Sequence, residues 1–363
     1  MTPSPVPPPP VPPEPGATTG WVIAGAGWVA RDHMAPALAA SPTSRVVAVV
    51  DRDPAAAREL AARFEGARAA TDLGEAFATP GAQVAYVATP NHAHREVVAA
   101  AAAAGLAVLC EKPLAATLAD AADLVAACEA AGVLAATAFD QRWHPAHRAA
   151  AELIAGGRLG TVTSVRIIYG CWLPPDWAPP GSTTGDNWRV DPARAGGGAY
   201  VDLAPHGLDL VGALLGEDVE RATTHLQHRV HDYAVDDGSV LVGSTASGVL
   251  VSIANSFNTV ETLPRRRLEV VGTAGQLVAT DTMGQTAGGR LELLDAATGA
   301  ASDVPFDGVT TPFAAQVRAV ERALSGETPW PFPLARDLRL LQLLTDALPP
   351  VPTPSHSALE VSP

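Results

Sequence analysis

Between Gly20 and about Phe139, short apolar runs alternate with Ala-rich stretches that have helical spacing. This alternation constrains the fold more than any other feature, because strands that alternate with helices form βαβ units around a parallel sheet. We therefore expect an α/β domain over residues 20–140. The predicted strands are Trp21–Ala24, Val46–Val50, Val84–Ala88, Ala107–Cys110 and Val133–Thr137, and the predicted helices include Pro54–Phe64, His94–Ala103 and Leu118–Ala130.

A glycine-rich turn joins the first predicted strand to the helix that follows it, and it reads G-x-G-x-x-A from Gly25 to Ala30. In this motif the first glycine permits a tight turn, the second lets the backbone approach a pyrophosphate, and the small third residue lets the helix pack on the strand. The pyrophosphate lies at the positive end of the helix dipole. The motif predicts dinucleotide binding by Gly25, Ala26, Gly27, Trp28 and Val29.

Asp51 ends the second predicted strand, where an acidic side chain accepts hydrogen bonds from the ribose hydroxyls of a dinucleotide. Its negative charge would repel the 2′-phosphate of NADP, so we expect the cofactor to be NAD. Arg52 leaves NADP open as the alternative, because a guanidinium beside the ribose can pair with that phosphate. Stacking on the adenine and simple exposure to solvent are the other roles open to Arg52.

A second loop expected in the ligand crevice follows the run Val84–Ala88 and reads Thr89-Pro90-Asn91-His92-Ala93-His94. Loops at the carboxyl ends of parallel strands line that crevice. We expect Asn91 and His94 to cap the next helix and to form a wall on the cofactor side, and we expect Thr89 and Pro90 to contact the cofactor as well. We expect no metal at this pair of histidines, because no third ligand is near in the sequence.

Lys112 is the only lysine among the 24 basic residues, and it follows the predicted strand Ala107–Cys110. It therefore lies at the carboxyl edge of the sheet, where the nicotinamide is expected. Oxidation of an alcohol requires removal of the hydroxyl proton, which a lysine can assist when its surroundings favour the neutral amine. Arginine stays protonated and cannot do so. We predict that Lys112 is catalytic and that Glu111 and Lys112 also line the cofactor site.

After about Gln141 the alternation of strands and helices stops. Strand-like runs then follow one another without helices between them, which favours a mostly antiparallel sheet in an α+β domain over residues 141–348. These runs are Ser239–Val242, Val249–Asn255, Arg267–Val271, Gln276–Asp281 and Leu291–Leu294. An earlier strand is predicted at Thr161–Tyr169, and helices at Pro145–Ala155, from about Asp202 to Leu215, at Phe313–Leu324 and at Pro333–Leu348.

Three glycines, Gly196 to Gly198, precede the helix predicted to begin near Asp202. Asp202 and His206 are four residues apart and share one face of that helix. A carboxylate and an imidazole so placed can orient each other and bind a substrate hydroxyl, and histidine has a suitable pKa for proton transfer. The glycines suggest a close approach of the backbone to a ligand, which favours catalysis over a capping acid and a structural histidine.

Together these motifs resemble those of the Gfo/Idh/MocA family of glucose–fructose oxidoreductases, inositol dehydrogenases and MocA-like oxidoreductases. The resemblance covers roughly residues 20 to 348. It rests on the glycine turn, on Thr89-Pro90 with His94, on Glu111-Lys112-Pro113, and on the triple glycine followed by Asp202, His206 and Asp209. It implies a Rossmann domain followed by an α+β domain with a large, open, predominantly antiparallel sheet. The back of that sheet often forms oligomer contacts, which implies a homodimer or homotetramer.

The same resemblance implies an NAD(P)-dependent dehydrogenase or reductase. Hydride would pass between the cofactor and a secondary alcohol or ketone of a sugar, an inositol-like polyol or a sugar derivative. Lys112 would be the catalytic lysine, and Asp202 and His206 would bind and polarise the reacting hydroxyl. The peptide bond before Pro113 would be unusual, with a cis geometry that helps to aim Lys112. Pro205 is a departure from the family pattern, because a glycine is more usual in this segment.

The loop from Cys171 to Trp188 is rich in tryptophan and proline, and family substrates differ most in this region. Aromatic faces suit the apolar faces of sugar rings, and a loop packed on its own tryptophans is an almost equally good interpretation. Four residues are candidates for the wall of the substrate pocket beside Lys112, Asp202 and His206: Tyr169, Trp188, Arg189 and Tyr200.

Composition excludes several other classes of function. The net charge of −14 argues against nucleic acid and anionic lipid as partners. The longest apolar run, Val97–Cys110, is too short to span a bilayer, and no basic residue precedes Arg31 as an export signal would require. Three scattered cysteines fit reduced thiols better than a disulfide framework or a zinc site. We therefore expect a cytoplasmic protein without a bound metal.

Residues 1–19 and 349–363 are rich in proline, and we expect a disordered N-terminal tail and a flexible C-terminal tail. Two alternatives to a dehydrogenase remain open. One is an enzyme that cleaves glycosidic bonds by transient oxidation and elimination, which makes no net NADH. The other is a dinucleotide-sensing regulator without catalysis, a role that the presence of Lys112 with Asp202 and His206 disfavours.

Overall fold

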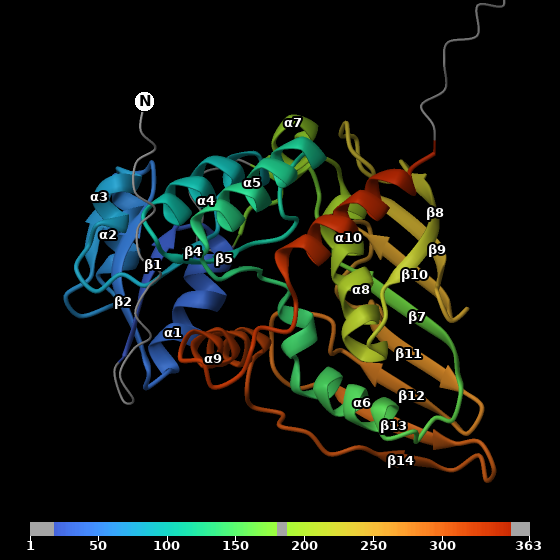
Figure 1. Cartoon of the computed structure of the whole chain (residues 1–363). Coiled ribbons are helices and arrows are strands. Elements are labelled where there is room, and N and C mark those ends of the chain that lie inside the picture. The colour runs from blue at the N-terminus through green and yellow to red at the C-terminus, as the bar shows by residue number, and fades with distance from the viewer. Residues whose placement is uncertain (1–17, 180–186, 350–363) are drawn as a thin grey trace, which may run out of the picture.

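The computed structural model describes residues 18–179 and 187–349 (Figure 1). The two predicted tails therefore lie outside the described residues, apart from residues 18, 19 and 349. Thr19 already belongs to the first strand, so the first domain begins slightly earlier than the sequence indicates.

The first domain is built on a six-stranded sheet in the order β3-β2-β1-β4-β5-β6, and all neighbouring strands are parallel. This confirms the predicted α/β fold. The sequence did not predict β3, which is a short edge strand. The strands are β1 (Thr19–Ala24), β2 (Ser44–Val50), β3 (Arg68–Ala70), β4 (Val84–Val87), β5 (Ala107–Cys110) and β6 (Ala135–Thr137).

Helices cover both faces of this sheet. A π-helical turn (Ala30–Met34), α1 (Ala35–Ala40) and α2 (Pro54–Ala61) pack on one face, and α3 (Leu73–Phe77), α4 (His94–Ala103) and α5 (Leu118–Ala131) pack on the other. Side chains cap two of these helices: Asp53 accepts a hydrogen bond from Ala55 N at the start of α2, and Thr117 accepts one from Asp120 N at the start of α5. Helix α2 ends three residues before the predicted Phe64.

The second domain contains an eight-stranded sheet in the order β14-β13-β12-β11-β7-β10-β9-β8. Only the β7–β10 pair is parallel among its described neighbours, so the predicted mostly antiparallel sheet is confirmed. The sequence did not predict β8 and β14. The strands are β7 (Val162–Gly170), β8 (Val219–Gln227), β9 (Gly238–Thr245), β10 (Leu250–Ser256), β11 (Arg266–Gly272), β12 (Gly275–Thr280), β13 (Arg290–Asp295) and β14 (Ala301–Asp303).

Helices cover only one face of the second sheet (Figure 1). They are α6 (Pro145–Ala155), α8 (Ala199–Leu215) and α10 (Leu334–Asp346), and their apolar side chains share one core with the sheet. Apolar side chains at Ile168, Val240, Val242 and Leu250 are between 44% and 64% exposed on the strands. The opposite face of the sheet is therefore partly apolar, and no helix of residues 18–179 and 187–349 covers it.

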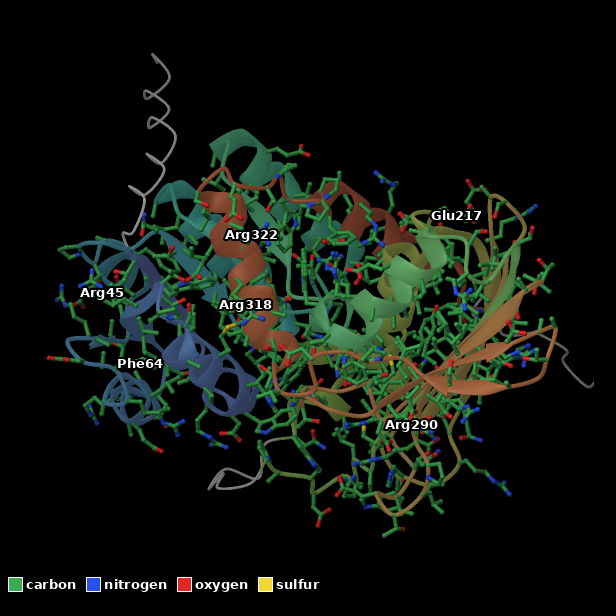
Figure 2. The ribbon with its side chains drawn as sticks, turned by 90° about the horizontal axis from the view of Figure 1, so that it is seen from below. Arg45, Phe64, Glu217, Arg290, Arg318 and Arg322 are labelled. Carbon is green, nitrogen blue, oxygen red and sulfur yellow. The ribbon has the colours of Figure 1, made fainter. Side chains whose placement is uncertain are left out.

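The last two helices return to the first domain. Phe313 and Val317 of α9 (Pro312–Leu324) belong to the same core as Trp21 of β1, and Leu334 of α10 belongs to the core on the other face. Figure 2 shows α9, marked by Arg318 and Arg322, beside the blue elements of the first domain. Because α10 also packs on the second sheet, these helices tie the two domains together.

No helix in residues 18–179 and 187–349 is both long and apolar enough to cross a membrane.

Candidate active site

The glycine turn has the geometry that a pyrophosphate needs. Gly25 has φ of +99°, and a Cβ added there would lie 2.6 Å from Ala88 O, so only glycine fits. Gly27 is exposed, and a Cβ added there would meet nothing within 4 Å. Ala30 is fully buried where the helix packs on the sheet. The turn is therefore closed on the protein side and open on the side where a phosphate would bind.

Asp51 lies beside this turn at the carboxyl end of β2. Its Oδ2 accepts a hydrogen bond from Ala26 N at 2.7 Å, and its Oδ1 accepts one from Asp53 N at 2.9 Å. Arg52 is exposed to solvent. A carboxylate held next to an open glycine turn is the arrangement that binds an adenosine ribose, so the residues present fit a nicotinamide dinucleotide.

Asn91 and His94 are both buried and bonded within the protein, and neither side chain caps the next helix, contrary to the expectation of a helix cap and a wall on the cofactor side. Asn91 Nδ2 donates to Ala195 O at 2.8 Å, across the domain boundary. The ring nitrogens of His94 lie 2.9 Å from Thr89 O and 3.1 Å from Pro113 O. Burial lowers the pKa of His94 to about 4, so the ring is neutral and its single N–H donates to one of these two carbonyl oxygens.

A backbone carbonyl oxygen lies against each ring nitrogen of His94, which leaves no open position there for a metal. In residues 18–179 and 187–349, no group of three or more His, Cys, Asp or Glu side chains is arranged to hold a metal ion.

Glu111 and Lys112 follow β5 at the edge of the sheet, and the Lys112–Pro113 peptide bond is cis. Glu111 is buried, and Tyr86 donates its hydroxyl hydrogen to Glu111 Oε1 at 2.6 Å. Burial raises the pKa of Glu111 despite this hydrogen bond and the nearby Lys112. The side chain of Glu111 therefore turns into the protein, below the edge that carries Lys112.

Lys112 and Asp202 form an ion pair across the domain boundary. Lys112 Nζ lies 2.6 Å from Asp202 Oδ1 and also donates to Asp202 O at 2.9 Å. Burial alone would raise the pKa of Asp202, but Lys112 and Arg189 outweigh it and hold that pKa below its ordinary value. An ammonium carries three N–H donors, so one remains for a substrate oxygen.

His206 lies one helical turn after Asp202 and is almost fully buried. Its ring packs edge-on against Tyr169 and Phe139, with centroids 5.6 and 6.1 Å apart. Burial, followed by the positive charge of Lys112, lowers the pKa of His206 well below its usual range. The structure thus brings Lys112, Asp202, His206 and Tyr169 together, with a neutral imidazole beside an ion pair.

Helix α8 begins at Ala199, three residues before the predicted start at Asp202. The buried Asp236 caps it by accepting hydrogen bonds from Gly198 N and Tyr200 N at 3.0 and 2.7 Å. Added Cβ atoms at Gly196 and Gly198 would lie 2.5 Å from Ala116 O and 2.0 Å from Asp236 O. The glycines therefore let this chain's own backbone approach, and the expectation that they approach a ligand is wrong.

Tyr200 does not line the pocket, contrary to the prediction. It is 1% exposed, and its hydroxyl donates to Leu344 O in α10 at 2.8 Å. Tyr200 and Asp202 are two positions apart, which is about 200° around a helix, so the two side chains point in opposite directions.

Three tryptophans surround Arg189 near the glycine turn. The Arg189 guanidinium carbon lies 4.6 Å from the ring centroid of Trp188, 5.4 Å from that of Trp177 and 5.9 Å from that of Trp28. Trp28 and Trp177 also pack edge-on at 5.8 Å, which joins the cofactor turn to the second domain. Trp172 instead packs on His231, away from this cluster. Part of the loop, residues 180–186, lies outside the described residues.

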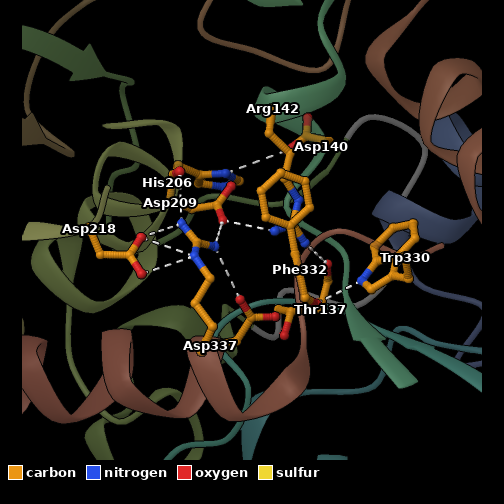
Figure 3. A network of polar contacts seen from close by, with 10 residues as sticks. Thr137, Asp140, Arg142, His206, Asp209, Asp218, Trp330, Phe332 and Asp337 are labelled. Atoms are coloured by element: carbon orange, nitrogen blue, oxygen red, sulfur yellow. Dashed lines mark hydrogen bonds and ion pairs between the residues drawn. The ribbon is translucent and has the colours of Figure 1, made fainter. Parts of the chain in front are cut away.

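Sequence reasoning missed Asp140 and Arg142, two buried charged residues behind His206, and it named Asp209 only as part of a motif (Figure 3). Asp140, in the turn after β6, places Oδ1 3.4 Å from His206 Nδ1. In the same region Asp209 binds the guanidinium groups of Arg142 and Arg336 at 2.9 and 2.6 Å. The sequence feature that could have predicted them is their position: Asp140 and Arg142 follow a strand at the carboxyl edge of a parallel sheet, where the loops that bind ligands lie.

Comparison with known proteins adds to this geometry. Residues 19–139 match an oxidoreductase family with an NAD-binding Rossmann fold (GFO_IDH_MocA), and residues 147–278 match the GFO/IDH/MocA C-terminal domain. The 1,5-anhydro-D-fructose reductase of Ensifer adhaerens is 32% identical over 289 residues, which is 79% of this chain and 83% of the reductase. The D-xylose 1-dehydrogenase (NADP(+)) 2 of Haloferax volcanii is 33% identical over 308 residues, 85% of this chain and 90% of the dehydrogenase.

The fold is similar to that of levoglucosan dehydrogenase, solved in complex with NADH and levoglucosan. The TM-score is 0.79 at 22% identity, and the match covers 91% of this chain and 96% of that one.

Proposed function

We propose that this chain, which belongs to the Gfo/Idh/MocA family of NAD-binding oxidoreductases, interconverts a secondary alcohol and a ketone on a sugar, polyol or sugar derivative. The observation that carries this proposal is the Lys112–Asp202 ion pair beside the buried His206, at the sheet edge that also holds the open glycine turn. Hydride transfer to or from the alcohol carbon is the chemistry that bound NAD(P) supplies.

Lys112 and His206 have different roles toward the substrate hydroxyl. In oxidation, the remaining N–H of Lys112 binds the hydroxyl oxygen and stabilises its developing negative charge, as an oxyanion donor does. Because Lys112 is held as an ion pair with Asp202, the neutral His206 is the better acceptor for the hydroxyl proton. In reduction, His206 returns the proton to the carbonyl oxygen. The sequence alone had given Lys112 a share in removing the proton.

For the cofactor, we propose a preference for NAD over NADP. The Asp51 carboxylate beside Ala26 N would repel a 2′-phosphate bound at the same ribose. Replacing Asp51 with Ala should reduce the preference for NADH over NADPH. Fluorescence titrations should show weaker binding of NADH and tighter binding of NADPH. Unchanged affinities for both cofactors would contradict this assignment.

For the substrate, we propose a sugar or sugar derivative with an apolar ring face. Trp177 and Trp188 gather around Arg189 close to the site, and aromatic faces suit such rings. The relatives named above are a 1,5-anhydro-D-fructose reductase, a D-xylose 1-dehydrogenase and a levoglucosan dehydrogenase. They favour a reaction on a sugar hydroxyl or keto group over glycosidic elimination and over a regulator without catalysis.

We also propose that the protein is a homo-oligomer formed through the uncovered face of the second sheet. Val240, Val242 and Leu250 are exposed there, and an apolar sheet face of this kind is suited to a second copy. A Val242→Arg variant should lower the molar mass measured by light scattering. A wild-type monomer, or an unchanged mass in the variant, would refute this proposal.

The test of the function is a panel of levoglucosan, D-xylose, D-glucose and myo-inositol with NAD or NADP, and of 1,5-anhydro-D-fructose with NADH or NADPH, followed by absorbance at 340 nm. Net formation or consumption of NAD(P)H with at least one sugar is expected. Glycoside cleavage without net NADH would support elimination instead, and cofactor binding without turnover of any compound would support a regulator.

A further inference from the structure

We infer that Asp140 is a positioning residue for His206: it holds the proton on Nδ1 and leaves Nε2 as the atom that exchanges a proton with the substrate. This inference rests on the proposed function for its consequence in catalysis, although the state of the His206 ring can be measured without any substrate.

The geometry places the Asp140 carboxylate at one nitrogen of the His206 ring. Asp140 Oδ1 lies 3.4 Å from His206 Nδ1, and both side chains are at most 3% exposed (Figure 3). Within the described residues His206 Nδ1 has no hydrogen-bond partner, so a small closing movement toward Asp140 would satisfy it. Nε2 is then the ring nitrogen left for the substrate.

The carboxylate is itself held in place from the other side. Asp140 Oδ2 accepts a hydrogen bond from Gln141 Nε2 at 2.9 Å. Gln141 is fully buried and is fixed by two hydrogen bonds with the Gly284 backbone, each 3.0 Å long. Three segments distant in sequence therefore combine to aim one carboxylate at one imidazole nitrogen.

The neighbouring charges leave Asp140 free for this role. Arg142, two residues along, directs its guanidinium to Asp209 and to Thr137 O, so it does not pair with Asp140. Burial together with Glu111, in the next loop, raises the pKa of Asp140 to about 7, while Lys112 and the Gln141 hydrogen bond favour the carboxylate, so Asp140 has the ionised form that this role needs above about pH 7. The other titratable groups that act on the pair are Lys112 and Asp202 on the substrate side and Tyr169 on β7.

The chemical consequence concerns the charge that forms on His206. In oxidation the substrate O–H bond breaks and its proton goes to Nε2, which makes an imidazolium beside the positive Lys112. An Asp140 carboxylate at Nδ1 accepts the N–H hydrogen bond, fixes the reactive tautomer and compensates the new charge. This is the general logic by which a carboxylate supports a catalytic histidine. Without it, the imidazolium forms next to a like charge with no opposite charge at Nδ1.

The test uses the full chain with three variants, Asp140→Asn, His206→Ala and the double variant, in complex with NADH. Two-dimensional ¹⁵N NMR of the wild type should show His206 with its proton on Nδ1, and Asp140→Asn should lose this tautomer preference. With the fastest sugar of the panel, Asp140→Asn should lower kcat at least about tenfold with little change in KM or in NADH affinity. The rising limb of kcat/KM should move to lower pH.

The double variant separates positioning from a purely structural role. If Asp140 acts through His206, the double variant should lose no more activity than His206→Ala alone. Multiplied losses would overturn the inference, and so would a wild-type His206 protonated on Nε2. Turnover and a pH profile unchanged in Asp140→Asn would overturn it as well. If no sugar is turned over, the proposed function fails while the NMR result still decides the tautomer.

Discussion

Replacing Asp209 by Asn should destabilise the protein far more than the loss of one surface ion pair. Asp209 lies in α8 with no exposed side-chain surface, between Arg142 at 2.9 Å and Arg336 at 2.6 Å. Arg336 would keep Asp218 at 2.8 Å. Arg142 would keep the Thr137 carbonyl, an amide oxygen at position 209, the face of Phe332 4.0 Å from its guanidinium carbon, and the charge of Asp337 without a direct ion pair. The variant therefore leaves one fully buried guanidinium without a carboxylate directly bonded to it (Figure 3).

Removing one partner from a buried ion pair costs about 3–5 kcal/mol of unfolding free energy. For a chain of 363 residues, an unfolding entropy of about 2 cal/mol/K per residue converts this into a fall in Tm of about 5 °C. Urea denaturation followed by circular dichroism measures the unfolding free energy, and calorimetry measures the Tm. Adding Arg142→Met to Asp209→Asn should recover part of the loss, because the unpaired charge is then removed.

The matched control is Glu327→Gln, which breaks the exposed Arg322–Glu327 pair at 3.0 Å and should cost at most about 1 kcal/mol. If Asp209→Asn changed stability no more than this control does, the buried cluster would not hold α8 against the first domain as the contacts indicate.

Two further predictions concern the cofactor turn and the response to pH. Gly27→Ala should weaken NADH binding by about tenfold or more without changing the Tm of the free protein, because its Cβ meets only the space where the pyrophosphate binds. Gly25→Ala should lower the Tm itself, because φ is +99° and the Cβ would clash with backbone. Equal Tm values in the two variants would contradict this distinction. Burial lowers the pKa of His147 to about 3, so its contribution to stability is complete above pH 6.5 and is lost as pH falls toward 3. In the wild type the unfolding free energy should therefore fall between pH 6.5 and 4, and His147→Gln should make this fall smaller by up to about 1.4 kcal/mol per pH unit. Urea denaturation at several pH values measures it, and the same dependence on pH in the variant and the wild type would refute the prediction.

The elements that the sequence predicted correctly are those whose side chains are buried in a regular pattern. Val46–Val50 and Ala107–Cys110 are continuous apolar runs because both faces of a parallel sheet are covered. Arg68–Ala70 and Ala301–Asp303 were missed because each is a short edge strand with most of its residues exposed. Val219–Gln227 was missed because polar residues occupy most of its positions.

The candidate site was predictable where one local motif sets the position of a side chain. Lys112 follows a buried strand, and Asp202 and His206 are four residues apart on one helix, so local spacing places them. Asp140 was missed because its contact with His206 joins the turn after β6 to α8, and no local pattern reports such packing. Tyr200 was misplaced because the true start of α8 depends on the cap from Asp236, which comes from a distant segment.

The most direct measurement of the proposed chemistry is single-turnover oxidation of the best sugar by Lys112→Met, with NADH affinity measured on the same protein. Lys112 is the only residue whose N–H donors reach from the sheet edge to Asp202 within the described part of the chain. Losing an oxyanion donor of this kind should lower the rate by about 10²–10³-fold, while the dissociation constant for NADH stays unchanged. Oxidation within threefold of the wild-type rate would contradict the proposed role of Lys112.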